Sequence, residues 1–155
     1  MTTCAQHIAL LAGESGECEG PVAILVVAPS EHDTQALGRI LDDANWTLHH
    51  SVSHADALKV LRKRRIAAVV CEAQLPDASW RELLPAVAAL PSPPPVLVSS
   101  ALADDALWAE VVNLGGSDVL GKPFDREEVI RGISLAWLTW KIKEHRKNRA
   151  RWVSA

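Results

Sequence analysis

An acidic side chain closes one of the most apolar stretches of the sequence. Glu72 follows the apolar run AAVVC at 67–71 and precedes the turn-forming residues Leu75, Pro76 and Asp77. A carboxylate at the end of a buried strand is costly to remove from water unless a cation or hydrogen-bond donors compensate it. Glu72 is therefore the first candidate for a charged site, and it requires a partner from elsewhere in the chain.

The cysteines and histidines do not form a comparable candidate. Three widely spaced cysteines, Cys4, Cys18 and Cys71, lack the paired spacing of a zinc site or a disulfide framework. The six histidines share no helical or strand spacing with a carboxylate or thiol: His7, His32, His49, His50, His54 and His145. We therefore expect no metal site and reduced thiols.

Composition limits the function classes. The chain has 155 residues, of which 48% are hydrophobic, which suits one domain with a core plus tails. Its net charge of −3 gives no global reason to bind nucleic acid or acidic membrane. Residues 1–20 have no basic leader, and no 18-residue apolar span occurs. We expect a flexible tail at 1–20, no transmembrane segment and a cytoplasmic location.

Five short apolar runs alternate with amphipathic stretches. The runs cover 23–28, 46–50, 67–71, 95–99 and 118–121. This alternation predicts five strands with a helix after each, and right-handed crossovers then give a three-layer α/β sandwich. In such sheets the functional site lies at the carboxyl ends of the strands, which is where Glu72 falls.

Local signals mark the helix boundaries. Ser53 and Ser79 each begin a predicted capping box, with an acid three residues later. Pro85 predicts a kink or a late start in the third helix. Gly115 suits the end of the fourth helix, and the last helix is expected to begin near Asp125.

Four segments in order resemble the receiver domain of bacterial response regulators. They are ILVVAPSEHD, VVCEAQLPD, PVLVSSA and GGSDVLGKPFDREEV, and the resemblance runs without a gap from about Ala23 to Gly132. It implies a flavodoxin-like (βα)5 fold with parallel strand order 2-1-3-4-5 and a role in two-component signalling. We expect a receiver-like domain at 21–132 and, at 133–155, an extension of the last helix with a basic tail.

Only part of the receiver site is present. Lys122-Pro123 matches the conserved dipeptide of that family, with a cis peptide bond implied, and Ser100 fills the hydroxyl position after strand four. The acidic pair after strand one is replaced by Ala28 and Pro29.

Two further positions depart from the family pattern. The resemblance places Glu72 where receiver domains have a phosphoacceptor aspartate. Val119 stands at the position of the aromatic switch. Ser100 and Val119 are thus the switch-equivalent residues.

These replacements remove oxygen ligands. Magnesium requires hard oxygen donors, and neither Ala28 nor Pro29 offers a side-chain oxygen, so Glu72 is left alone. Without the ion, phosphoryl transfer loses its main electrostatic partner. Glu31 and Asp33 fall in the first turn of the following helix, and we expect them to reach the pocket only by an unusual geometry.

Lys122 is the expected partner of Glu72. Our hypothesis is that Lys122 and a hydrogen bond from Ser100 keep Glu72 ionised and hold the domain in one state without phosphorylation. An alternative is that the site has lost its chemistry and keeps the ion pair because an unpaired, buried Lys122 would destabilise the fold more. A third possibility is a phosphorylatable domain that uses another acid, such as Asp77.

The C-terminal segment is the second informative region. Beyond Trp140 it carries six basic residues against the single acid Glu144, so the last helix is expected to project from the sheet. It is either a solvated charged end, a helix for dimerisation or partner docking, or a binder of nucleic acid or anionic membrane. The candidate interface residues are Trp108, Val112, Trp137 and Trp140.

Together these features predict a stand-alone, non-enzymatic signalling module. We expect no cofactor and no DNA-binding domain, and a partner that is another signalling protein, such as a kinase or an output protein. A homodimer through the fourth and last helices is also possible. A flavin-binding electron carrier would share the sheet order, but the segment APSEHDTQ offers few donors for a phosphate.

Overall fold

The computed structural model describes residues 22–153, so the expected tail at 1–20 lies outside the described residues. Five strands and the helices between them follow the predicted alternation. The strands are β1 (Ala23–Val27), β2 (Thr47–Ser51), β3 (Ala68–Glu72), β4 (Val96–Ser100) and β5 (Asp118–Gly121). The helices are α2 (Glu31–Asp43), α3 (His54–Lys63), α4 (Trp80–Ala88), α5 (Asp105–Asn113) and α6 (Arg126–Val153).

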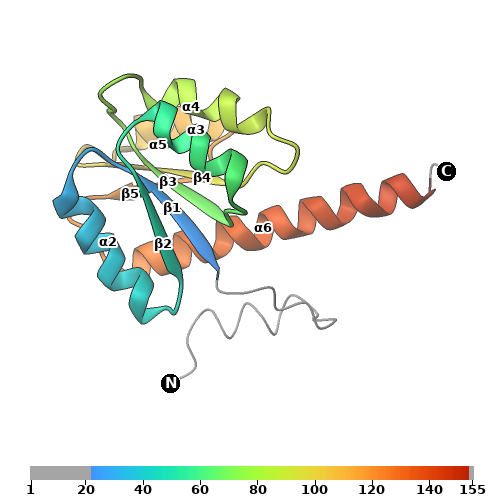
Figure 1. The fold of residues 1–155 in the computed structure, drawn as a ribbon, viewed down its shortest axis with the longest axis horizontal. Helices are drawn as coiled ribbons and strands as arrows, with labels where there is room; N and C mark the ends of the chain where they lie inside the picture. Colours follow the sequence, from blue (N-terminus) through green and yellow to red (C-terminus); the bar gives the residue numbers. More distant parts are fainter. Residues whose placement is uncertain (1–21, 154–155) are drawn as a thin grey trace.

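The sheet is parallel throughout, with strand order β2-β1-β3-β4-β5 (Figure 1). This confirms the predicted flavodoxin-like α/β fold. Because every connection between neighbouring parallel strands needs a crossover, the helices cover both faces of the sheet. The carboxyl ends of all five strands therefore meet at one edge.

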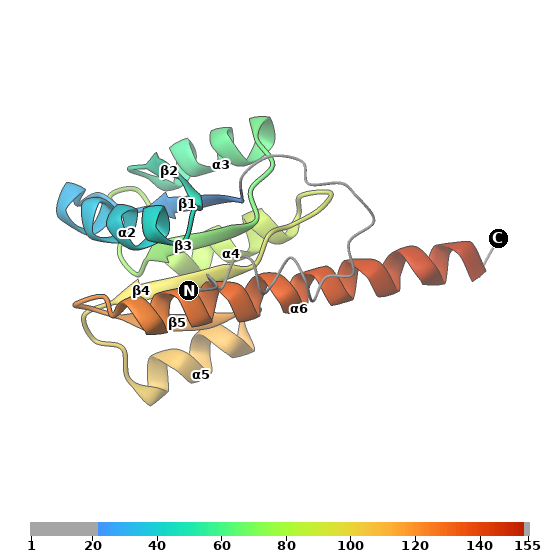
Figure 2. The same cartoon turned by 90° about the horizontal axis from the view of Figure 1, so that it is seen from below.

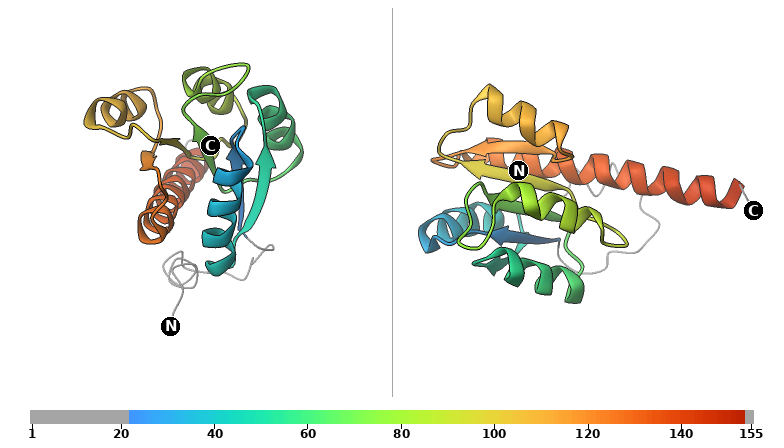
Figure 3. Two further views of the ribbon diagram at one scale, coloured as in Figure 1. Left: turned by 90° about the vertical axis from the view of Figure 1, so that its left-hand side faces the viewer. Right: turned by 90° about the horizontal axis from the view of Figure 1, so that it is seen from above.

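Two apolar clusters fill the spaces between the sheet and its helices. Val26, Val70 and Leu97 face the layer of α2 and α6, while the alternate residues of the same strands face α3, α4 and α5. Figure 3 shows these two helical layers on opposite sides of the sheet. Trp80 is the largest side chain that is fully buried, with 2% exposed, and belongs to the second cluster.

The helix boundaries test the predicted capping signals. Ser53 Oγ accepts a hydrogen bond from the Asp56 N–H at 3.2 Å, as the first capping box predicts. The second was wrong in part, because Ser79 precedes α4 without a side-chain cap. The helix begins at Trp80 and runs through Pro85. Gly115 ends the fourth helix with φ of +98°, a conformation that favours glycine.

Helix α6 is continuous across the predicted boundary at residue 133 and extends past the sheet (Figure 2). Asp125 Oδ2 accepts the Glu128 N–H at 3.0 Å, which fixes the predicted helix start. Gly132 lets the helix approach the sheet closely, since an added Cβ would lie 3.3 Å from Leu120 and 3.4 Å from Leu97. Within residues 22–153, no helix is long and apolar enough to cross a membrane.

Candidate functional site

Glu72 is the last residue of β3, and its carboxylate lies at the carboxyl edge of the sheet. The Nζ of Lys122, which follows β5, forms an ion pair with Glu72 Oε2. The two side chains are only 16% and 19% exposed, so the pair is largely withdrawn from water. The structure thus places beside Glu72 the cation that a carboxylate in this position requires.

A second carboxylate shares the same ammonium group. Asp33 Oδ2 accepts a hydrogen bond from Lys122 Nζ at 2.7 Å, across 89 residues of sequence. The expectation that Asp33 reaches the pocket only by an unusual geometry was wrong. Ser30 caps α2, so Asp33 stands in the first turn at the carboxyl edge, within reach of the long lysine side chain. Glu31 is exposed.

The hydroxyl that contacts Glu72 comes from Ser99 and not from Ser100. Ser99 Oγ lies 3.3 Å from Glu72 Oε2, whereas Ser100 Oγ accepts the Leu102 N–H at 3.1 Å. The predicted bond from Ser100 was therefore wrong. In the register of β3 and β4, Glu72 pairs with Ser99, and paired residues direct their side chains to the same face. Ser100, one position later, faces the other way.

The two carboxylates raise the pKa of Lys122. Burial is the largest single influence and lowers it, but the hydrogen bonds and charges of Asp33 and Glu72 together outweigh burial. The ammonium form is thereby favoured. The peptide bond from Lys122 to Pro123 is cis, and the Lys122 N–H donates to the Ser100 carbonyl at 3.2 Å.

The first two residues after β1, Ala28 and Pro29, offer no side-chain oxygen to a cation, and the Ser30 hydroxyl caps α2. Ala28 is 3% exposed and belongs to the apolar core, and Pro29 is exposed. The Ala28 carbonyl lies 2.9 Å from the His50 ring, and both nearby carboxylates already contact Lys122. Among residues 22–153, no group of three or more candidate ligands could hold a metal ion. The two carboxylates placed at this edge, Asp33 and Glu72, are thus paired with an ammonium group, whereas magnesium binds through carboxylates that are free to coordinate it.

Residues 24–134 match the response regulator receiver domain. This chain belongs to that family. A comparison with curated proteins gives no match.

Solved receiver structures share the fold of this receiver domain. The signal receiver domain of an HD domain-containing protein from Pseudomonas fluorescens Pf-5 is 26% identical, with a TM-score of 0.72, and the match covers 81% of this chain and 93% of that one. The chemotaxis response regulator CheY4 of Vibrio cholerae is 21% identical, with a TM-score of 0.68, covering 76% and 99%. The receiver domain of the Francisella response regulator 1452 is 20% identical, with a TM-score of 0.68, covering 76% and 97%.

Asp77, the alternative acid in this receiver domain, is engaged elsewhere. Its two carboxylate oxygens accept the backbone N–H groups of His54 and Ala55 at 3.0 and 3.2 Å. These groups belong to the first turn of α3, where a negative charge is favourable. Asp77 therefore caps a neighbouring helix from the loop after β3.

Replacing Asp77 with alanine should lower the melting temperature at neutral pH. The hydrogen bonds from His54 and Ala55 lower the pKa of Asp77 below its ordinary value of 3.8, the His54 bond being the largest influence. A carboxyl group whose pKa is depressed by folding stabilises above its unfolded pKa and loses that contribution as the pH falls through its folded pKa. The difference in melting temperature between the two proteins should thus shrink below about pH 4. A difference that persists unchanged at pH 2 would contradict the capping role.

The remaining predicted residues lie in different environments. Val119 is partly buried against the cluster beneath α3, α4 and α5. Trp108 and Val112 on α5 are 50% and 39% exposed, as residues off the core stripe should be. Trp137 packs against the core beneath α2 and α6, so much of its ring is not available to a partner. Trp140 is partly exposed.

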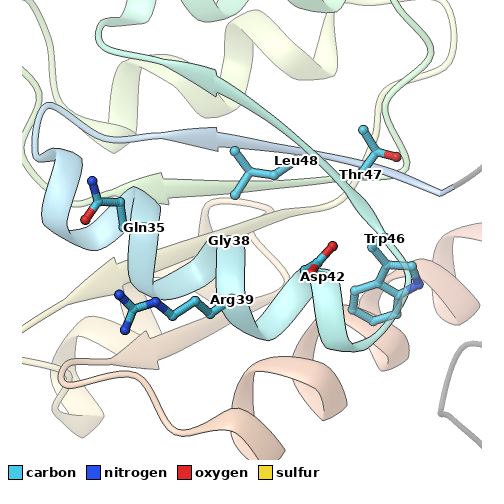
Figure 4. A pocket seen from close by; sticks show the side chains of 7 residues that line it. All are labelled: Gln35, Gly38, Arg39, Asp42, Trp46, Thr47 and Leu48. Atoms are coloured by element: carbon cyan, nitrogen blue, oxygen red, sulfur yellow. The ribbon is translucent and has the colours of Figure 1, made fainter.

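Two hollows open on the surface of the receiver domain. One lies beside the site, where Trp80, Arg81, Ser100, Leu102 and Glu110 contribute to its lining. Arg81 of α4 and Glu110 of α5 form a two-point ion pair across it. The other lies on α2 and β2, away from Glu72 (Figure 4). Its lining residues are Gln35, Gly38, Arg39, Asp42, Trp46, Thr47 and Leu48.

Proposed function

We propose that this receiver domain signals without phosphorylation, because its pocket is already occupied by an internal ion pair. The observation that carries the proposal is the position of Lys122 Nζ between Glu72 and Asp33. In this arrangement the lysine has two anionic partners within the chain. It needs no phosphoryl group to hold it at the carboxyl edge of the sheet.

Electrostatics support a slow or absent transfer reaction. Phosphoryl transfer depends on positioning and on a cation that neutralises the charge spread over the equatorial oxygens. Here Ala28 and Pro29 supply no ligands, and the two nearby carboxylates are paired with Lys122. Glu72 would also present a single negative charge, whereas a phosphate carries about −1.5 to −2. A domain held by the charge of Glu72 would therefore resemble a phosphorylated domain only in part.

The output of such a domain would be contact with another signalling protein. Receiver domains are generally signalling modules, and the exposed apolar side chains of α5 are suited to that role. Trp108 and Val112 lie one turn apart on its outer side. An exposed indole beside an aliphatic residue is typical of the centre of a docking surface. We assign this face to the partner protein.

Intact-mass analysis tests the proposal directly. The full chain is incubated with acetyl phosphate and Mg²⁺, and we expect no phosphate-sized gain in mass. The matched variant Glu72→Asp should also fail to gain mass, because the aspartate still lacks its cation ligands. The triple variant Ala28→Asp/Pro29→Asp/Glu72→Asp restores the family set and serves as the gain-of-function control. A phosphate-sized gain in the unmodified chain would overturn the proposal.

The role of Glu72 itself requires a second measurement. Glu72→Gln removes the charge at nearly constant volume and leaves Lys122 with Asp33 alone. We expect a lower urea midpoint, because a charge-assisted bond of the largely buried ammonium is lost. An unchanged midpoint would mean that Glu72 does not hold this state.

A further inference from the structure

Helix α6 presents an apolar stripe on the side that faces away from the core. Leu135 and Ile142 are 57% and 49% exposed and lie seven residues apart, so they project from the same side of the helix. Leu138 falls between them at helical spacing and is partly exposed. Ile133, which is buried against the sheet, is about 200° around the helix from Leu135. The stripe is therefore separate from the contacts that hold α6 to the body.

The two ends of this stripe differ in charge. Beyond Ile142 the same side bears Arg146 and Arg149, which are both exposed. Towards the start of α6, Glu127 in the first turn is exposed about 80° around the helix from Leu135, and Arg131 is exposed between them. Glu128 is turned toward the body, where its Oε1 accepts the Gly121 N–H at 3.4 Å. The stripe therefore has an apolar centre and a basic C-terminal end.

The whole chain shows the same separation of charge. Of its 16 basic and 19 acidic residues, six basic residues and one acid lie in 141–155. Residues 22–140 carry ten basic and fifteen acidic residues, a net charge of −5, against +5 for the C-terminal segment. The basic part of α6 projects beyond the sheet (Figure 2). It is attracted to an acidic surface of the kind that the body of this same protein provides.

We propose that a second copy of this chain covers the stripe, with the two α6 helices packed antiparallel. Antiparallel packing places the basic end of each helix beside the net-acidic body of the other copy, whereas parallel packing would stack Arg146 and Arg149 on their own copies. Antiparallel packing also places the partly positive N-terminus of each helix near the partly negative C-terminus of the other. The pairing is isologous, since one pattern supplies both complementary surfaces. Leu135 and Ile142 are both exposed, so the body leaves this side of its own helix open. This dimer does not depend on the phosphorylation state.

The first test is the mass of the full chain in solution. Light scattering after size exclusion, over a range of concentrations, should show a concentration-dependent mass approaching twice 16.8 kDa. Ile142→Glu should return the protein to a monomer, because it places a charge in the apolar centre. Val52→Glu is the matched control, since Val52 is exposed to a similar degree, 48%, outside α6. A monomer at all concentrations, or a dimer that Ile142→Glu leaves intact, would overturn the proposal.

The second test distinguishes the orientation of the helices. Arg146→Glu alone and Glu127→Lys alone should each weaken the dimer about 5-fold, because each places like charges together twice in a two-fold assembly. The double variant should recover the affinity of the unmodified chain. In a parallel pair, each of these positions would face the same position of the other copy. Each single change would then only exchange one like-charge contact for another. Single variants that bind as well as the unmodified chain, or a double variant without recovery, would contradict the antiparallel arrangement.

Discussion

Replacing Lys122 with methionine should lower the free energy of unfolding by about 2 kcal/mol. The substitution leaves Glu72 and Asp33, two like charges that are 16% and 19% exposed, without their shared cation. Removing one partner of a fully buried pair costs about 3–5 kcal/mol, and the partial exposure here reduces that figure. Urea unfolding followed by tryptophan emission measures the change. Lys59→Met, at an exposed position of α3, is the matched control and should have little effect.

The pH dependence of this difference identifies its cause. Folding raises the pKa of Lys122 above its ordinary value of 10.5. A lysine with a raised pKa contributes stability that is fully present below the unfolded pKa and is lost as the pH rises through the folded pKa. The difference between the two proteins should therefore be constant from pH 7 to 9 and should shrink above about pH 10.5. Equal stability of the two proteins at pH 7 would show that the lysine does not neutralise the carboxylates.

Replacing Trp80 with alanine should have the largest effect on stability, a loss of about 3–5 kcal/mol. Trp80 begins α4, is 2% exposed and packs in the cluster that holds α3, α4 and α5 to the sheet. Its removal loses the transfer free energy of the indole and leaves a cavity that the surrounding helices fill only in part. Urea unfolding followed by circular dichroism measures the loss.

Trp108 provides the control for that substitution. The same change to alanine at Trp108, which is 50% exposed on α5, should cost less than about 1 kcal/mol. If both substitutions had equally small effects, α4 would contribute little to the core.

The order of strands and helices could be predicted because the pattern of apolar residues and the residues that end helices indicate the same boundaries. The apolar runs at 23–28 and 95–99 became β1 and β4 with boundaries shifted by one residue. Gly115 marked the end of α5 because few residues other than glycine adopt its backbone conformation. The capping box predicted at Ser79 did not form, since a capping sequence does not ensure that the hydroxyl turns toward the helix.

The site could be predicted only in part, because its details depend on register and on side-chain reach. The pairing of Glu72 with Lys122 followed from the need of a withdrawn carboxylate for a cation. Ser99 was missed because the register of β3 with β4 decides which of two adjacent hydroxyls lies beside Glu72. Asp33 was missed because a helix position was treated as too remote, although α2 begins at the same edge of the sheet.

The close approach at Gly132 determines the direction in which the C-terminal part of α6 leaves the body. Leu97 and Leu120 lie directly beneath it, and Trp137 packs against the same core further along the helix. Gly132 and Trp137 are about 8 Å apart along the axis, and the helix continues for about 24 Å to Val153. The helix therefore acts as a lever with a short inner arm and a long outer arm. A side chain that lifted position 132 would displace the far end about threefold more and in the opposite direction.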